Sequence, residues 1–113
     1  MENVKRCLVI VNPTSGRERA PKYIPLLSSV LSKRYDDVSI KLTQKAGDAK
    51  NFARRAAEKN KDIICMGGDG TINEVLNGIT DFDRVRLGVI PTGSGNDFGR
   101  NLKLPKTPKE SLR

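Results

Sequence analysis

The sequence predicts an α/β fold of three layers, in which a parallel sheet carries helices on both faces. Continuous apolar runs, typical of strands buried on both faces, occupy residues 7–11, 63–66 and 87–90. The segments between the strands repeat apolar residues with the period of an amphipathic helix. Strands that alternate with helices of this length imply right-handed crossovers and a parallel sheet.

Four strands and three helices are expected, in the order βαβαβαβ. The second strand, at residues 38–42, alternates apolar and polar side chains, so we expect it to have one solvated face and to lie near an edge. The apolar stripes of the helices comprise Ile24, Leu27, Val30 and Leu31; Ala49, Phe52, Ala53, Ala56 and Ala57; and Ile72, Val75, Leu76 and Ile79.

Length and composition limit the class of protein. The 113 residues suit one domain, and 36% hydrophobic with 30% charged residues excludes a disordered chain. No stretch approaches the ~20 apolar residues of a membrane-spanning helix, so a soluble, unsecreted chain is expected. Cys7 and Cys65 lie in apolar runs and are expected to be core residues. The absence of histidine excludes Ser-His-Asp and Cys-His catalysis by this chain alone.

The net charge of +8 is compatible with several anionic partners. The basic residues are scattered, and no motif for binding nucleic acid accompanies them. A solvated basic surface is therefore the first interpretation, and attraction to an anionic membrane is the next.

Four loops rich in small polar and turn-forming residues follow the four strands, where open parallel sheets bind their ligands. They contain Asn12-Pro13-Thr14-Ser15-Gly16, Thr43 with Gly47-Asp48, Gly67-Gly68-Asp69-Gly70-Thr71, and Pro91-Thr92-Gly93-Ser94-Gly95-Asn96-Asp97. Any one such turn is weak evidence, but four on one rim of a sheet predict a binding site.

The third loop predicts a phosphate site. Its glycines let backbone N–H groups approach an anion, and the helix that follows directs its positive end to the same place. Thr71 and Glu74 also fit a capping box, so Thr71 is a candidate cap for that helix. A carboxylate among such amides requires a cation, so Asp69 is predicted to hold Mg²⁺ directly or through water.

Two familiar phosphate-binding motifs do not fit the spacing. No Lys follows these glycines as a Walker A loop requires. The dinucleotide fingerprint is absent after the first strand, and Gly93, Gly95 and Gly99 are spaced with one residue too many.

The motifs of three loops together resemble the diacylglycerol kinase catalytic domain family, in its bacterial lipid-kinase branch. The matching segments run from Val11 to Gly16, from Gly67 to Gly78 and from Pro91 to Arg100. The GGDGT core is shared with NAD kinases and, in weaker form, with phosphofructokinases. Its continuation into Asn73-Glu74 and the downstream Asn96-Asp97-Phe98 favour the lipid kinases.

The resemblance implies a Rossmann-like fold of the NAD kinase and diacylglycerol kinase type, and a kinase that uses ATP and Mg²⁺ to phosphorylate a lipid hydroxyl. It implies a cytoplasmic protein of phospholipid metabolism that binds its lipid substrate at the membrane surface. No nucleic-acid partner is expected, and a homodimer is compatible with the resemblance. The nucleotide site would comprise Asn12, Pro13, Thr14, Ser15, Gly16, Thr43, Gly68, Asp69, Gly70, Thr71, Ile72, Asn73, Glu74 and Ser94. The family usually has Thr where this chain has Ser94, which keeps the hydroxyl.

The resemblance also implies a division of labour between two domains. Residues 1–113 would be the N-terminal nucleotide-binding domain, with Asp69 positioning metal and phosphate, while a C-terminal β-rich domain outside this chain would supply the general base. The chain alone is then expected to bind nucleotide without turnover. An NAD kinase-like half and a nucleotide-binding or interaction module without catalysis remain the alternatives.

The start signals at Thr107-Pro108-Lys109-Glu110 predict a further helix that continues to Arg113.

Overall fold

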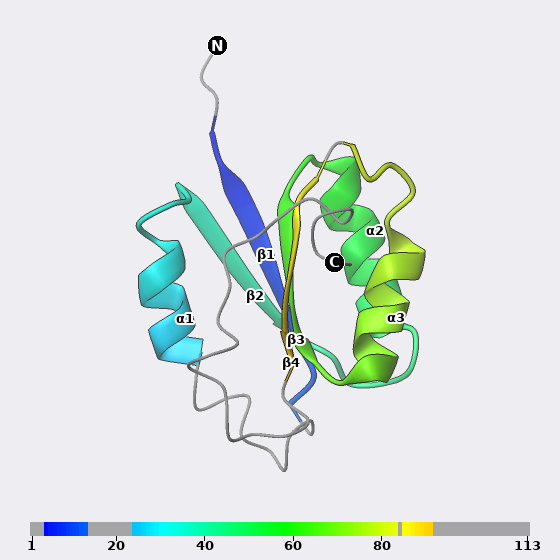
Figure 1. Ribbon diagram of the computed structural model, residues 1–113. Coiled ribbons are helices and arrows are strands. Elements are labelled where there is room, and N and C mark those ends of the chain that lie inside the picture. The colour runs from blue at the N-terminus through cyan, green and yellow to red at the C-terminus, as the bar shows by residue number, and fades with distance from the viewer. Residues whose placement is uncertain (1–3, 14–23, 84, 92–113) are drawn as a thin grey trace.

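The structure is a computed structural model that describes residues 4–13, 24–83 and 85–91, and it contains the predicted succession of elements (Figure 1). The four strands pair in parallel in the order β2-β1-β3-β4, which confirms the predicted fold class. The strands are β1 (Arg6–Val11), β2 (Asp37–Leu42), β3 (Asp62–Gly67) and β4 (Leu87–Pro91), and the helices are α1 (Ile24–Leu31), α2 (Asp48–Glu58) and α3 (Asp69–Gly78).

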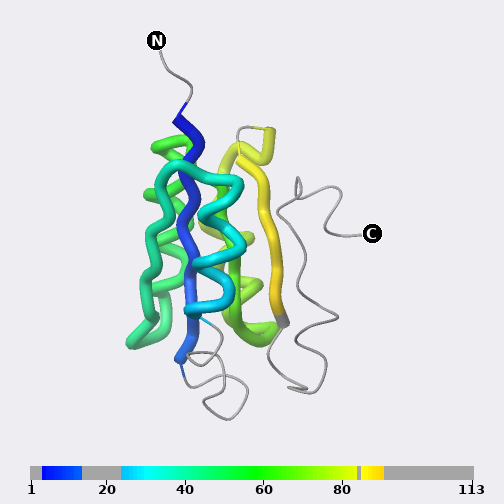
Figure 2. The backbone as a smooth tube through the Cα atoms, turned by 90° about the vertical axis from the view of Figure 1, so that its left-hand side faces the viewer, coloured from blue at the N-terminus to red at the C-terminus, as the bar shows by residue number. Residues whose placement is uncertain are grey.

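The helices form two outer layers around the sheet. Helix α1 covers one face and lies nearest the viewer in Figure 2, while α2 and α3 cover the other face (Figures 1 and 2). Successive residues of each central strand enter opposite cores: Leu8 and Ile10 pack beneath α2 and α3, whereas Val9 packs beneath α1. The apolar runs in the sequence arise from this burial on both faces.

Strand β2 lies at the edge of the sheet, as its alternating pattern predicts. It pairs with β1 alone among the described strands. Val38 and Ile40 pack against the core beneath α1, whereas Leu42 remains 46% exposed.

The two cysteines are core residues, as predicted. Cys7 and Cys65 are fully buried free thiols, and each lies in a different core cluster. Helix α2 presents four buried alanines to the sheet and to α3. Gly78 allows α3 to approach α2 closely, because a Cβ at this position would collide with the carbonyl oxygen of Lys50.

The strand order creates a crevice at the carboxyl edge of the sheet. From β1 the chain passes to its neighbour β2, while β3 lies on the other side of β1. In open α/β sheets, a ligand binds where the connections from adjacent strands diverge in this way.

Among the described helices, none has the length and apolarity to cross a bilayer. The helix predicted to start at Pro108, with Thr107 as its N-cap, lies outside the described residues.

Candidate functional site

A pocket of about 240 Å³ lies at the carboxyl edge of the sheet. Four of the predicted site residues, from three different loops or helices, line it together. They are Asn12, Thr43, Thr71 and Glu74. Pockets for whole small molecules usually begin at ~300 Å³, so this pocket suits part of a larger ligand, such as its phosphates.

Asn12 and Thr71 connect the ends of the two central strands. The backbone N–H of Asn12 donates to the carbonyl oxygen of Met66 at 3.1 Å, which extends the β1–β3 pairing by one residue. The Asn12 side-chain amide then donates to Thr71 Oγ1 at 3.2 Å. Thr71 is only 8% exposed, so its hydroxyl belongs to the wall of the pocket rather than to the open surface.

The start of α3 differs from the predicted capping box, and that prediction was wrong. The helix begins at Asp69, its N-cap is Gly68, and no side chain caps it. Thr71 is therefore the third helical residue, and its hydroxyl accepts from Asn12 instead. Glu74 does not cap α3 either, because its Oε1 accepts a hydrogen bond from the backbone N–H of Gly47 at 3.0 Å.

The first turn of α3 presents its backbone amides at the rim. The first intrahelical bond runs from the N–H of Ile72 to the carbonyl of Gly68 at 3.0 Å. The N–H groups of residues 69–71 precede this bond and make no backbone hydrogen bond to another described residue. Such amides, together with the positive end of the helix dipole, form a common binding site for phosphate.

The three glycines of the β3–α3 turn have different structural roles. A Cβ on Gly67 would lie 2.8 Å from Thr71 Cβ, so Gly67 is required by the close approach of the Thr71 side chain. A Cβ on Gly68 or on Gly70 would meet nothing within 4 Å, and neither residue has a positive φ. The described fold therefore does not require glycine at positions 68 and 70, where the open space faces solvent or a ligand.

The loop between β2 and α2 is held by two acidic side chains. Asp48 Oδ2 accepts from the N–H groups of Gln44 and Lys45 at 2.8 and 3.0 Å. The hydrogen bond from Gln44 is the main cause of the lowered pKa of Asp48. Glu74 of α3 holds the same loop at Gly47, whose φ of 94° is a conformation that favours glycine.

Asp69 is an exposed carboxylate at the first position of α3. No group of three or more His, Cys, Asp or Glu side chains that could hold a metal occurs among the described residues. Magnesium is commonly held by one or two carboxylates together with water and substrate phosphates, so a single carboxylate beside the amides at a helix start fits such an ion. The same carboxylate also stabilises the helix by its position in the first turn.

The remaining predicted residues are less closely connected to the pocket. Ile72 packs against the core beneath α3, and Asn73 is exposed on that helix. Pro13 follows Asn12 directly and does not line the pocket. The predicted residues outside the described ranges are Thr14, Ser15, Gly16 and Ser94.

Sequence reasoning missed four residues that line the pocket, namely Gln44, Lys45, Ala46 and Ala49. Lys45 is chemically the most informative, because its ammonium group offers positive charge beside the pocket. One feature of the sequence could have indicated Lys45: it lies in the loop after the second strand, which is expected at the same edge of the sheet as the glycine-rich turn.

Comparison with known proteins gives consistent results. A family model described as the diacylglycerol kinase catalytic domain matches residues 6–113. A diacylglycerol kinase of Staphylococcus saprophyticus is 48% identical over 103 residues, which are 89% of this chain and 34% of that protein. One of Staphylococcus carnosus is 46% identical over 103 residues, with the same coverage. The chain thus spans about a third of the length of these curated relatives.

The fold comparison agrees with the sequence comparison. A crystal structure of a diacylglycerol kinase from Bacillus anthracis strain Sterne superimposes with a TM-score of 0.68 and 33% sequence identity. The match covers 88% of this chain and 37% of that one.

Proposed function

This chain belongs to the diacylglycerol kinase catalytic domain family, and we propose that it supplies the ATP-binding half of an enzyme that phosphorylates a lipid hydroxyl. Relatives that carry the name diacylglycerol kinase support the lipid as acceptor. The geometry of the carboxyl edge supports the nucleotide as donor.

The observation that carries the proposal is the convergence of Asn12, Thr43 and Thr71 on one pocket beside the start of α3. In this proposal the amides of residues 69–71 bind phosphate oxygens, which are strong acceptors. Lys45, which lines the same pocket, adds positive charge. The hydrogen bond between Asn12 and Thr71 holds the first turn of α3 against the end of β1, so that the amides keep their positions when phosphate binds.

Asp69 is proposed to hold Mg²⁺ directly or through water, as the only acid of the β3–α3 turn. A bound Mg²⁺ supplies charge neutralisation on the phosphates, which is a main part of phosphoryl-transfer catalysis. We therefore assign it to positioning rather than to general base catalysis, and we assign the base to a further domain.

The acceptor is proposed to reach this rim from a membrane surface, since a diacylglycerol-like lipid resides there. The lining of the pocket at this rim is mainly polar, so this pocket does not suit acyl chains. The lipid would thus be held by another part of the enzyme, while this half orients the donor phosphate.

The test is transfer of labelled phosphate from ATP by the protein that carries this domain. Diacylglycerol in mixed micelles and NAD are offered as alternative acceptors. We expect Mg²⁺-dependent labelling of the lipid and at least a hundredfold loss of kcat in Asp69→Asn, roughly the scale of removing one electrostatic group from a transition state. Labelling of NAD alone would contradict the proposal.

Asp81→Asn is the matched control for this assay. Asp81 is likewise exposed, and it lies in the α3–β4 connection, outside the pocket at the carboxyl edge. The control separates the position of the charge at residue 69 from its effect on the net charge of the protein. An equal loss in both variants would contradict a specific role for Asp69.

A further inference from the structure

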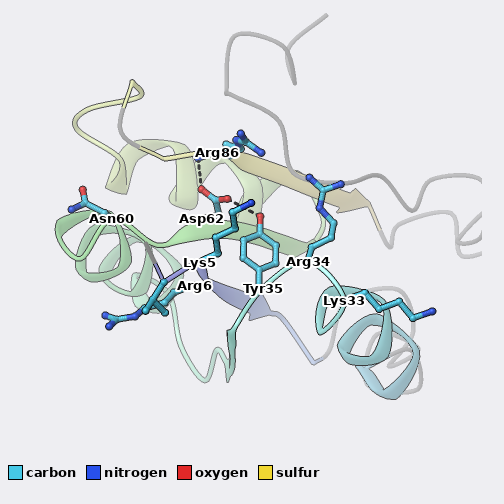
Figure 3. A pocket seen from close by; sticks show the side chains of 9 residues that line it. Lys5, Arg6, Lys33, Arg34, Tyr35, Asn60, Asp62 and Arg86 are labelled. Atoms are coloured by element: carbon cyan, nitrogen blue, oxygen red, sulfur yellow. Dashed lines mark hydrogen bonds between the residues drawn. The ribbon is translucent and has the colours of Figure 1, made fainter. Parts of the chain in front are cut away.

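A second pocket, of about 510 Å³, lies at the opposite, amino edge of the sheet (Figure 3). The starts of β1 and β3, the residue before β4, and the turns after α1 and α2 contribute to it. Its lining comprises Val4, Lys5, Arg6, Lys33, Arg34, Tyr35, Asn60, Asp62 and Arg86. Five of these residues are cationic and one is acidic, so the pocket is strongly basic.

The single acid of the pocket is already engaged by neutral donors. Asp62 Oδ2 accepts from the Tyr35 hydroxyl at 2.6 Å, and Asp62 Oδ1 accepts from the backbone N–H of Arg86 at 3.0 Å. These bonds tie β3 to the α1–β2 turn and to the residue before β4. They also leave the Asp62 carboxylate unpaired with any of the cations among the described residues.

The cations of the pocket are likewise without an acidic side-chain partner among the described residues. In Figure 3, the Lys5 side chain lies beside the Tyr35 and Asp62 pair. The guanidinium groups of Arg34 and Arg86 project outward at the border of the pocket, and Arg6 and Lys33 extend away from the pair. Another carboxylate, that of Asp36, lies close by, but it accepts the backbone N–H of Lys5 and does not line the pocket. Like charges gathered from separate segments repel one another, so a ligand that relieves this repulsion would be bound favourably.

The floor of the pocket is rigid. Tyr35 is 8% exposed, and its ring belongs to the core beneath α1. Burial, followed by the hydrogen bond to Asp62, raises the pKa of Tyr35, so the hydroxyl stays neutral and keeps donating to Asp62. A fixed floor with exposed cationic side chains around it matches a small, multiply charged anion better than a flat polymer surface.

We propose that this amino-edge pocket binds a phosphate-bearing anion, either free phosphate or a phosphate monoester, through Lys5, Arg34 and Arg86. Guanidinium groups form paired hydrogen bonds with phosphate oxygens, and an ammonium group adds a compact charge. The site is separate from the carboxyl-edge pocket, with which it shares no lining residue.

The test is a titration of the chain with inorganic phosphate at constant ionic strength, observed through backbone amide NMR signals. We expect saturable shifts at Lys5, Tyr35, Asn60 and Arg86. In a Lys5→Gln, Arg34→Gln double variant, affinity should fall about tenfold or more, since two charge-assisted hydrogen bonds are removed. No hydrogen bond or ion pair joins either side chain to another described side chain, so the fold should be retained.

Lys50→Gln, Arg54→Gln is the control, because it removes the same charge from the exposed surface of α2. It should leave the phosphate affinity within about twofold. The proposal is overturned by the absence of saturable shifts at the amino edge, by shifts only at residues 68–71, or by equal losses in both double variants.

A second arm identifies the source of the phosphate group. Vesicles of phosphatidylcholine with and without phosphatidic acid are mixed with the two double variants. If the phosphate titration succeeds and the pocket variant alone loses binding to phosphatidic acid, the ligand is a lipid headgroup. If the phosphate titration succeeds and vesicle binding is equal in all variants, the ligand is a soluble phosphate. Each result supports the phosphate site.

Discussion

The side chains of Asn12 and Thr71 meet across 59 residues of sequence in a 3.2 Å hydrogen bond from Asn12 Nδ2 to Thr71 Oγ1. One follows β1 and the other lies in the first turn of α3, so the bond connects the two loops that border the crevice of the sheet. The amides in the first turn of α3, which we propose to bind phosphate, are thereby held in a fixed position relative to β1. A contact of this kind links the stability of the fold to the geometry of the proposed nucleotide site.

Replacing Thr71 by valine should test this link. Valine keeps the branched shape of the side chain but removes the hydroxyl that accepts the hydrogen bond from Asn12 at a partly buried position. We expect a loss of about 1–2 kcal/mol in the free energy of unfolding, measured with urea, and weaker ATP binding. Thr71→Ser retains the hydroxyl and should preserve ATP affinity better than valine does. Equal ATP affinities in the valine variant and the wild-type chain would contradict the link.

Alanine substitutions at the glycines of the β3–α3 turn should distinguish effects on the stability of the fold from effects on ATP binding. Gly67→Ala forces a Cβ against Thr71 and should destabilise the fold by about 1–3 kcal/mol. Gly70→Ala lies in a helix, where alanine is preferred by about 1 kcal/mol, so its stability should be unchanged or higher. Its ATP affinity should nevertheless fall, because the new methyl group occupies the space next to the amides. An ATP affinity unaffected by Gly70→Ala would argue against phosphate at this turn.

Glu74 should act by holding the β2–α2 loop. Glu74→Ala removes the acceptor of the Gly47 N–H, so hydrogen exchange at Gly47 should become faster and ATP affinity should decrease. Glu74→Gln keeps an acceptor oxygen without the charge and should retain most of the protection. If the two variants exchange at the same rate as the wild-type chain, Gly47 is held by something other than Glu74.

The buried thiol of Cys65 should make stability depend on alkaline pH. Burial raises the pKa of Cys65 from about 9 to about 12. A thiol with a raised pKa in the folded state contributes its full stability below pH 9 and loses it as the pH rises toward 12. The free energy of unfolding should fall in this window by up to about 1.4 kcal/mol per pH unit for this group.

The comparison of wild-type chain with Cys65→Ala isolates that thiol. Tyr35 and Cys7 also have raised pKa values and remain present in both proteins. Urea denaturation at a series of pH values should therefore show a shallower decline in the alanine variant. Identical slopes would show that Cys65 is accessible to ionisation in the folded state.

The strand and helix order could be predicted because it depends on local periodicity. Continuous burial in β1 and β3, the alternation in β2 and the alanine face of α2 are each visible within a few neighbouring residues. The convergence of the loops followed from a general rule about parallel sheets, and Asn12, Thr43, Thr71 and Glu74 do line one pocket.

Contacts that depend on distant partners were not visible in the sequence. The capping-box interpretation failed because the Thr71 hydroxyl has another partner in Asn12, and because α3 begins three residues earlier than a Thr71 cap requires, at Asp69. Lys45 and the Gly47–Glu74 bond depend on how the β2–α2 loop folds over α3. The cations of the amino-edge pocket come from segments that are far apart in the sequence and meet only because of the strand order. In the sequence they are scattered, and such a pattern is typical of an ordinary solvated surface.

The central claim is that this chain binds ATP at the carboxyl edge of its sheet, and a titration of the chain with ATP and Mg²⁺ followed by backbone amide NMR tests it most directly. The account predicts saturable shifts at the amides of residues 68–71, with smaller shifts at Asn12 and Thr43, and weaker binding in Gly70→Ala. The absence of shifts at those amides at millimolar ATP, or shifts confined to the amino-edge pocket, would contradict it.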